Sequence, residues 1–101
     1  MELSEVKRFL EELDQNNVEF DRHFYKRTGE RLITEGMARS FLSQIKKLEK
    51  IEQGRDNRFK LWFKMSRRYS LILIIEIGIS KGLKVMSAWN ASKKWQDKLK
   101  Q

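Results

Sequence analysis

Residues 58–65, Arg-Phe-Lys-Leu-Trp-Phe-Lys-Met, constrain the fold more than any other segment of the chain. Apolar side chains occupy every second position of this segment, at Phe59, Leu61, Phe63 and Met65. Successive side chains of a β-strand point to opposite faces of a sheet, so a period of two indicates a half-buried strand. We therefore expect a strand with one apolar face and one face that carries basic side chains and Trp62.

Two further segments in the second half of the chain are typical of strands. Residues 71–77, Leu-Ile-Leu-Ile-Ile-Glu-Ile, are β-branched and do not alternate, which favours a central strand covered on both faces. Residues 83–88 predict a third strand, and residues 51–57 could add an edge strand and a turn around Gly54. The short connections favour an antiparallel meander of three or four strands.

The first half of the chain has the periodicity of helices. Residues 4–15, with Ser4 as N-cap, predict a packing helix whose apolar face comprises Val6, Phe9, Leu10 and Leu13. Residues 18–20 are expected to be extended or a link. Asp21 can cap a short second helix, because Gly29 supplies a C-terminal stop soon after it.

Two more helices are predicted further along the chain. Thr34 is the expected N-cap of a helix that ends near residues 46–49. After the last strand, Asn90 is the expected cap of a C-terminal helix at residues 91–101, which Trp95 and Leu99 would hold against the domain.

At 101 residues the chain is expected to form a single α+β domain. N-terminal helices, with a helical extension at residues 1–17, precede a three- to four-stranded antiparallel sheet and the C-terminal helix at residues 91–101. The absence of cysteine excludes disulfides and thiolate metal sites. Since the N-terminal residues lack the uncharged core of a signal peptide and no apolar run could span a bilayer, we expect a cytoplasmic protein without membrane contact.

The net charge of +8 and the pI near 9.9 favour a polyanionic partner, with nucleic acid first and an acidic protein second. The charge is unevenly distributed. Residues 1–21 contain Lys7 and Arg8 against the acidic residues Glu2, Glu5, Glu11, Glu12, Asp14, Glu19 and Asp21. The positive charge therefore belongs to the rest of the chain.

The residue types limit the chemistry. One histidine and no cysteine leave carboxylates as the other possible metal ligands, and these do not have the spacing of a calcium loop or a zinc helix. No glycine-rich loop precedes a helix in the manner of a nucleotide-binding site, so neither a metal nor a cofactor is expected. Metal-independent cleavage of RNA remains, in which the 2′-hydroxyl attacks its own phosphodiester with the help of protein acid and base groups.

His23, Arg27 and Arg31 could supply those groups. On a helix they follow one another at intervals of four and share one face. Two guanidinium groups would bind a phosphate and favour the neutral imidazole, which can act as a base near pH 7. The alternative is that His23 is a capping or core-edge residue and that both arginines are simply solvated.

The segment His-Phe-Tyr-Lys-Arg-Thr-Gly-Glu-Arg-Leu-Ile-Thr, which contains this trio, resembles the signature of a family of small His-x3-Arg-x3-Arg domains. That family is similar to the RelE-like toxins, within the barnase-EndoU-colicin-RelE ribonuclease fold. The resemblance implies a RelE-like fold and a metal-independent endoribonuclease, the toxin of a toxin-antitoxin pair with an acidic antitoxin. This chain departs from the family's pattern at Phe24, where the family has a small alanine, and at Leu32, where the family has glycine.

The resemblance also implies roles for residues outside the trio. Arg68 and Tyr69 are expected in a turn, where RelE-like enzymes tend to place cationic and phenolic groups, so they are further catalytic candidates. Carried over by position, Ser87 falls where the family's closing strand carries a hydroxyl. Arg67 adjoins Arg68 as a candidate RNA-binding residue.

The basic face of the strand at residues 58–65 is a candidate RNA-binding surface. Arg58, Lys60 and Lys64 share it with Trp62, an arrangement suited to phosphates and a stacked base. The alternative is a solvated sheet face. Trp89 and Trp95 are more typical of packing residues.

Three functions are therefore consistent with the sequence: an endoribonuclease acting on free or ribosome-bound RNA, a non-catalytic nucleic-acid-binding module, and an interaction protein that forms a homodimer through residues 4–15 or the edge of the sheet.

Overall fold

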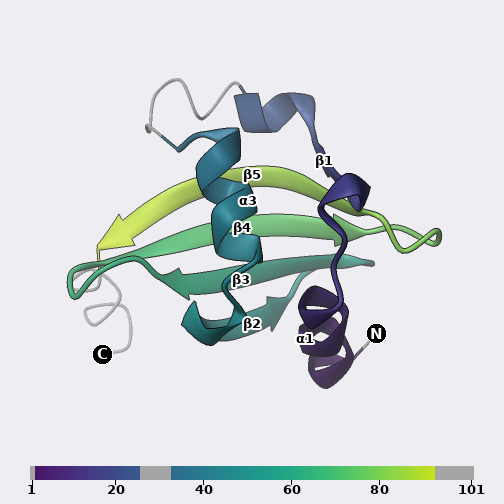
Figure 1. Cartoon of the computed structure of the whole chain (residues 1–101), viewed down its shortest axis with the longest axis horizontal. Coiled ribbons are helices and arrows are strands. Elements are labelled where there is room, and N and C mark those ends of the chain that lie inside the picture. Colours follow the sequence, from purple (N-terminus) through teal and green to yellow (C-terminus); the bar gives the residue numbers. More distant parts are fainter. Residues whose placement is uncertain (1, 26–32, 93–101) are drawn as a thin grey trace.

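The computed structural model describes residues 2–25 and 33–92, which form a five-stranded sheet with helices packed on it (Figure 1). The helices are α1 (Leu3–Glu11) and α3 (Glu35–Leu42), with 3-10 turns at Gln15–Asn17 and Ile45–Lys47 and helical residues at 22–25. The strands are β1 (Val18–Phe20), β2 (Leu48–Gln53), β3 (Arg58–Lys64), β4 (Tyr69–Ile77) and β5 (Leu83–Ser92). None of the helices within these residues is long and apolar enough to cross a membrane.

The sheet has the strand order β1-β5-β4-β3-β2, and β2 to β5 form the expected antiparallel meander. β4 occupies the middle of the sheet, and most of its residues are buried, as its apolar sequence predicts. β3 alternates between buried and accessible residues, which confirms the prediction of one apolar and one basic face. β2, at one edge, confirms the predicted edge strand, although it begins at Leu48.

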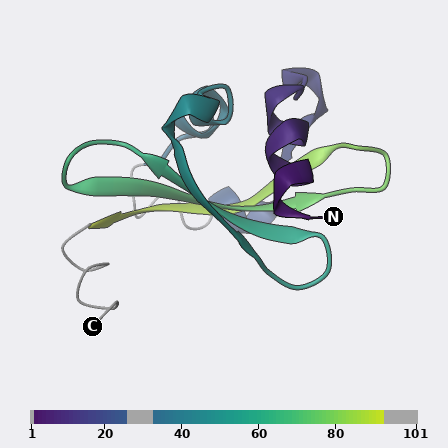
Figure 2. The same cartoon turned by 90° about the horizontal axis from the view of Figure 1, so that it is seen from below.

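α1 and α3 lie on the same face of the sheet (Figure 2). α1 begins with a capping box between Glu2 and Glu5, not at Ser4, and buries Val6 and Leu10. The hydroxyl of Thr34 accepts the Met37 amide at 3.1 Å and caps α3 as expected. Between the helices and the sheet lies one apolar core, with fully buried side chains that include Phe59, Leu61, Phe63, Leu73, Ile75 and Val85.

The predicted RelE-like fold class, with a three- to four-stranded antiparallel sheet, is wrong in strand number and strand direction. Residues 18–20 are a fifth strand, β1, which pairs in parallel with β5 in the register Val18 to Leu83 and Phe20 to Val85. Three residues carry too little periodicity to identify a strand. Its formation depends on hydrogen bonds to a segment more than 60 residues away in the sequence, which no local pattern contains.

The predicted C-terminal helix at residues 91–101 is also wrong where the structure describes it. Ala91 and Ser92 are the last residues of β5 and pair with Ser70 and Tyr69 of β4. The helix-capping tendency of Asn90 is overcome because the sheet ladder continues through this segment and satisfies the main-chain groups. Residues 93–101, which include Trp95, lie outside the described residues.

α3 ends at Leu42, earlier than the predicted end near residues 46–49. Side-chain hydrogen bonds accompany this end: the Ser43 hydroxyl donates to the Arg39 carbonyl at 3.3 Å, and the Gln44 amide donates to the Ser40 carbonyl at 3.0 Å. Such local bonds stabilise the end of a helix by satisfying its last carbonyls.

Candidate nucleic-acid interface

His23 lies in the helical residues that follow β1, and its side chain is 75% exposed. The Asp21 carboxylate lies 2.6 Å from Nδ1 of His23 and also accepts the His23 main-chain amide at 3.1 Å. The side-chain hydrogen bond from His23, followed by the main-chain one, holds the pKa of Asp21 below its ordinary value of 3.8. Asp21 therefore orients the ring through Nδ1 and leaves Nε2 as the nitrogen that could exchange a proton with a ligand.

The other catalytic candidates divide into two groups. Arg27 and Arg31 lie outside the described residues. Arg68 and Tyr69 lie at the turn between β3 and β4, where the Ser66 hydroxyl accepts both of their main-chain amides at 3.2 Å.

The sheet register separates this turn from His23. The Asp21 amide, two residues before His23, donates to the carbonyl of Val85, whereas Tyr69 pairs with Ser92 at the far end of β5. At about 3.3 Å per residue, the two positions on β5 are roughly 20 Å apart. The described residues therefore do not bring His23 and Tyr69 into one cleft.

The candidate RNA-binding residues on β3 share one face of the sheet, opposite α1 and α3. Direct cross-strand partners point to the same face, so the register Trp62 to Ile72 to Trp89 forms one row across β3, β4 and β5. Lys60, Ile74 and Ser87 form the next row. We call this surface the tryptophan face and define it by Lys60, Trp62, Ile72, Ser87 and Trp89.

Lysine ammonium groups lie close to both indoles of the tryptophan face. Nζ of Lys60 lies 4.7 Å from the centre of the Trp62 ring and 5.6 Å from that of Trp89. Nζ of Lys50, on β2, lies 5.7 Å from the Trp62 ring. These distances are within the range of cation–π attraction, so the sheet holds one ammonium group close to two partly exposed indoles.

A carboxylate fixes the first indole. Trp62 Nε1 donates to Glu52 Oε1 at 2.8 Å, and the same oxygen lies 3.2 Å from Nζ of Lys50. This hydrogen bond satisfies the polar end of the indole, so a ligand would contact the ring of Trp62 and the ammonium groups beside it rather than Nε1.

The rows on either side of the tryptophan face extend its positive charge. Arg58 pairs across the sheet with Glu76 and forms a salt bridge to it at 3.0 Å, and Lys84 lies beyond Glu76 in the same row. Lys64 is exposed and lies in the row nearest the β3–β4 turn. The turn itself contains Arg67, which is also exposed. The predicted residues Arg58, Lys60, Trp62, Lys64 and Ser87 thus lie on one side of the sheet.

The sequence alone did not identify Trp89 as part of this surface. A bulge at Met86 interrupts the alternation of β5, because Val85 pairs with Ile75 while Ser87 pairs with Ile74. The period-two pattern therefore changes phase within the strand. Lys50 was missed because β2 begins three residues before the predicted edge strand.

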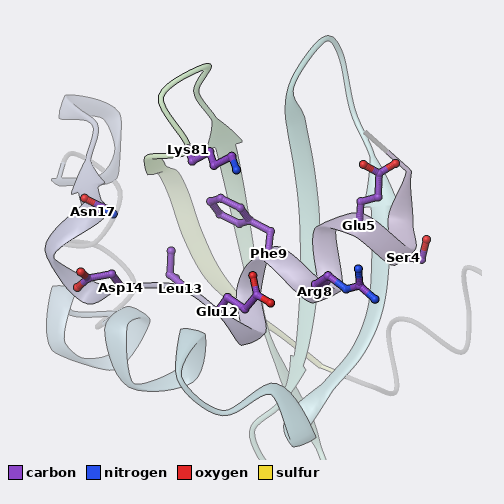
Figure 3. Close-up of a pocket in the computed structure, with 9 residues that line it drawn as sticks. All are labelled: Ser4, Glu5, Arg8, Phe9, Glu12, Leu13, Asp14, Asn17 and Lys81. Carbon is purple, nitrogen blue, oxygen red and sulfur yellow. The ribbon is translucent and has the colours of Figure 1, made fainter.

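A separate hollow of about 600 Å³ lies between α1 and the turn that follows β4 (Figure 3). Phe9 and Leu13 provide its apolar lining, and carboxylates such as Glu12 alternate with the cations of Arg8 and Lys81. Among the residues that the structure describes, those predicted to bind RNA or to act in catalysis do not line this hollow.

Comparison with known proteins adds no relative: no family model, curated protein or solved structure matches the chain. Within residues 2–25 and 33–92, no group of three or more histidine, cysteine, aspartate or glutamate side chains is arranged to hold a metal ion.

Proposed function

We propose that this protein is a nucleic-acid-binding module that binds single-stranded RNA on its tryptophan face. The observation that carries the proposal is the position of Lys60, whose ammonium group lies near the rings of both Trp62 and Trp89. Aromatic rings stack with bases, and cations neutralise the phosphates between those bases. Few other ligands have flat aromatic groups linked by regularly spaced negative charges.

Single-stranded RNA fits this surface better than duplex RNA. The bases of a duplex are paired and stacked on each other, so their faces are not available to an indole. A base that stacks on a tryptophan typically contributes about 1–3 kcal/mol to binding. Two such bases would contribute binding energy by stacking. A few phosphate contacts would add to it and make the affinity fall steeply as the salt concentration rises.

The test is fluorescence anisotropy of a labelled single-stranded RNA, titrated at several salt concentrations with wild type, Lys60→Met and Lys7→Met. Lys7 is exposed on α1, on the other side of the sheet, so Lys7→Met removes the same charge away from the tryptophan face. We expect Lys60→Met to weaken binding and to reduce the slope of log K against log salt by about 0.7, the value for one phosphate contact on a single strand. Equal effects of the two substitutions, or binding that does not depend on salt, would contradict the proposal.

Metal-independent cleavage of the bound RNA, the activity of a ribonuclease toxin, is the second candidate function. The specific observation in its favour is the exposed His23 ring held through Nδ1 by Asp21. This arrangement resembles the base and orienting acid of proton-transfer sites. An acidic antitoxin that covers the basic residues would be its partner.

Cleavage is tested by incubating labelled RNA in EDTA with wild type and His23→Ala, while binding is measured on an uncleavable 2′-deoxy analogue. Loss of cutting with unchanged binding in His23→Ala would support catalysis by His23. Binding by the wild type without cutting, with and without ribosomes, would leave the binding module as the function.

A further inference from the structure

We infer that the tryptophan face binds two consecutive nucleotides of a strand that crosses the sheet from β3 to β5, with one base on Trp62, the next on Trp89, and their linking phosphate at Lys60. This inference rests on the proposed function and adds the path and the register of the ligand.

The spacing of the indoles sets the path. Trp62 and Trp89 lie on β3 and β5, with Ile72 of β4 as their common cross-strand neighbour. Neighbouring strands are about 4.8 Å apart, so the two tryptophan positions are separated by roughly 10 Å. Successive phosphates of a helical strand rise only about 3.4 Å along its axis. The ligand must therefore be splayed, with its two bases unstacked from each other.

The position of Lys60 sets the register. Its row is adjacent to the row of the indoles, and its ammonium group lies within 5.6 Å of both ring centres. A phosphate that links two bases stacked on these rings would lie between them, where Lys60 is the described cation shared by both indoles. Lys50 lies on the β2 side of Trp62 and would contact the phosphate on the outer side of the first base.

The residue between the indoles affects specificity. Ile72 is 2% exposed and has no side-chain donor or acceptor, so the floor between the two bases cannot form hydrogen bonds to base edges. The Nε1 donor of Trp62 is already bonded to Glu52. Recognition at this site therefore depends on stacking and charge, which are similar for different base sequences.

The first experiment measures tryptophan fluorescence in two variants with a single tryptophan on the sheet, Trp62→Phe and Trp89→Phe. Each also carries Trp95→Phe, because Trp95 would add background emission, and phenylalanine keeps an aromatic face at the altered position. The probes are three short oligoadenylates of equal length and charge. The first has two adjacent bases, in the second an abasic unit replaces one of these bases, and in the third an abasic unit separates the two bases. Far-UV circular dichroism checks that each variant is folded.

We expect the oligonucleotide with two adjacent bases to quench both indoles with one common Kd. Loss of one base should weaken binding roughly 5- to 150-fold, the equivalent of one lost stacking interaction. If the oligonucleotide with separated bases binds more tightly, or a duplex binds equally well, the inferred register is wrong while the proposed function stands. If none of the probes binds and sedimentation shows a dimer that protects both indoles, a second copy of the chain covers this face and both proposals fail.

A second experiment tests the phosphate contact. A neutral methylphosphonate replaces the linkage between the two bases, and binding is compared in wild type and Lys60→Met. We expect the neutral linkage to weaken binding to wild type roughly two- to fivefold, as for loss of one surface ion pair, and to have no effect on Lys60→Met. An equal loss in both proteins would show that Lys60 does not contact this phosphate.

Discussion

Replacement of Glu52 by glutamine should strengthen RNA binding. The Glu52 carboxylate accepts the Trp62 indole at 2.8 Å and pairs with Nζ of Lys50 at 3.2 Å, so its negative charge lies beside the proposed path of the phosphates. Glutamine keeps an oxygen that can accept the indole hydrogen, but it carries no charge. The Glu52→Gln variant therefore separates the role of Glu52 in holding Trp62 from its repulsion of a polyanion.

The magnitude follows from Coulomb's law. A unit charge about 6 Å from a phosphate in water contributes about 332/(80 × 6), or roughly 0.7 kcal/mol, of repulsion. Its removal should raise the affinity about threefold. Lys50 also loses its carboxylate partner, and one additional phosphate contact would make the salt slope steeper by about 0.7. The assay is fluorescence anisotropy of a single-stranded RNA at three or more salt concentrations.

Glu11→Gln is the matched control, because Glu11 is exposed on α1 and the substitution changes the net charge by the same amount. If the gain came only from net charge, both variants would bind equally well. Weaker binding by Glu52→Gln than by wild type would refute the argument, since it would mean that the carboxylate itself contacts the ligand. The ion pair with Lys50 is exposed, so stability should change by less than about 1 kcal/mol.

Three further predictions concern the fold that supports this surface. Arg39→Met should reduce the free energy of unfolding, measured in urea, by about 1–3 kcal/mol, because Nη2 of Arg39 donates to the Val18 carbonyl at 3.2 Å and links α3 to β1. Arg39→Lys keeps the charge but lacks the planar guanidinium group, so it should recover only part of this loss. Full recovery would contradict the role of the Arg39 hydrogen bond. Asp21→Asn should be less stable than wild type at neutral pH, and the two proteins should become equally stable at strongly acidic pH in urea titrations. The His23 hydrogen bond lowers the folded-state pKa of Asp21, so its stabilisation is present above the unfolded-state pKa and is lost as the pH falls through the folded-state pKa. A difference in stability that does not depend on pH would contradict this prediction. Leu73→Ala, at a fully buried position in β4, should cost about 2–5 kcal/mol by thermal or chemical denaturation, and a loss below 1 kcal/mol would mean that the core lies elsewhere.

Local patterns were sufficient to predict the meander of β2 to β5. The alternation at Phe59, Leu61 and Phe63 and the continuous apolar run of β4 are properties of single strands, and burial in the structure follows them. β1 could not be predicted in this way, because its three residues are a strand only through their parallel pairing with β5. The capping pattern at Asn90 was misleading for a related reason: the pairing of β5 with β4, which no local pattern contains, continues past Asn90 to Ser92.

The part of the candidate site that lies within a single strand was also predictable from the sequence. Lys60 and Trp62 alternate within one strand, so their common face follows from the period of two. The approach of Trp89 to Lys60 depends on two strand registers and on the bulge at Met86, none of which is encoded in a short segment. The trio that carries the family resemblance remains a prediction, because Arg27 and Arg31 lie outside the described residues.

The two tryptophans of this face flank Ile72, which is 2% exposed, and their own rings remain partly exposed to a ligand. Neither Trp62 nor Trp89 belongs to the apolar core between the helices and the sheet. A sheet face that only contacts water is stable with polar and charged side chains, and partly exposed indoles reduce solubility. The carboxylates of an acidic protein would match the lysines around these rings but cannot stack on the indoles. A single-stranded nucleic acid matches both, since its bases stack on the rings and its phosphates pair with the ammonium group between them.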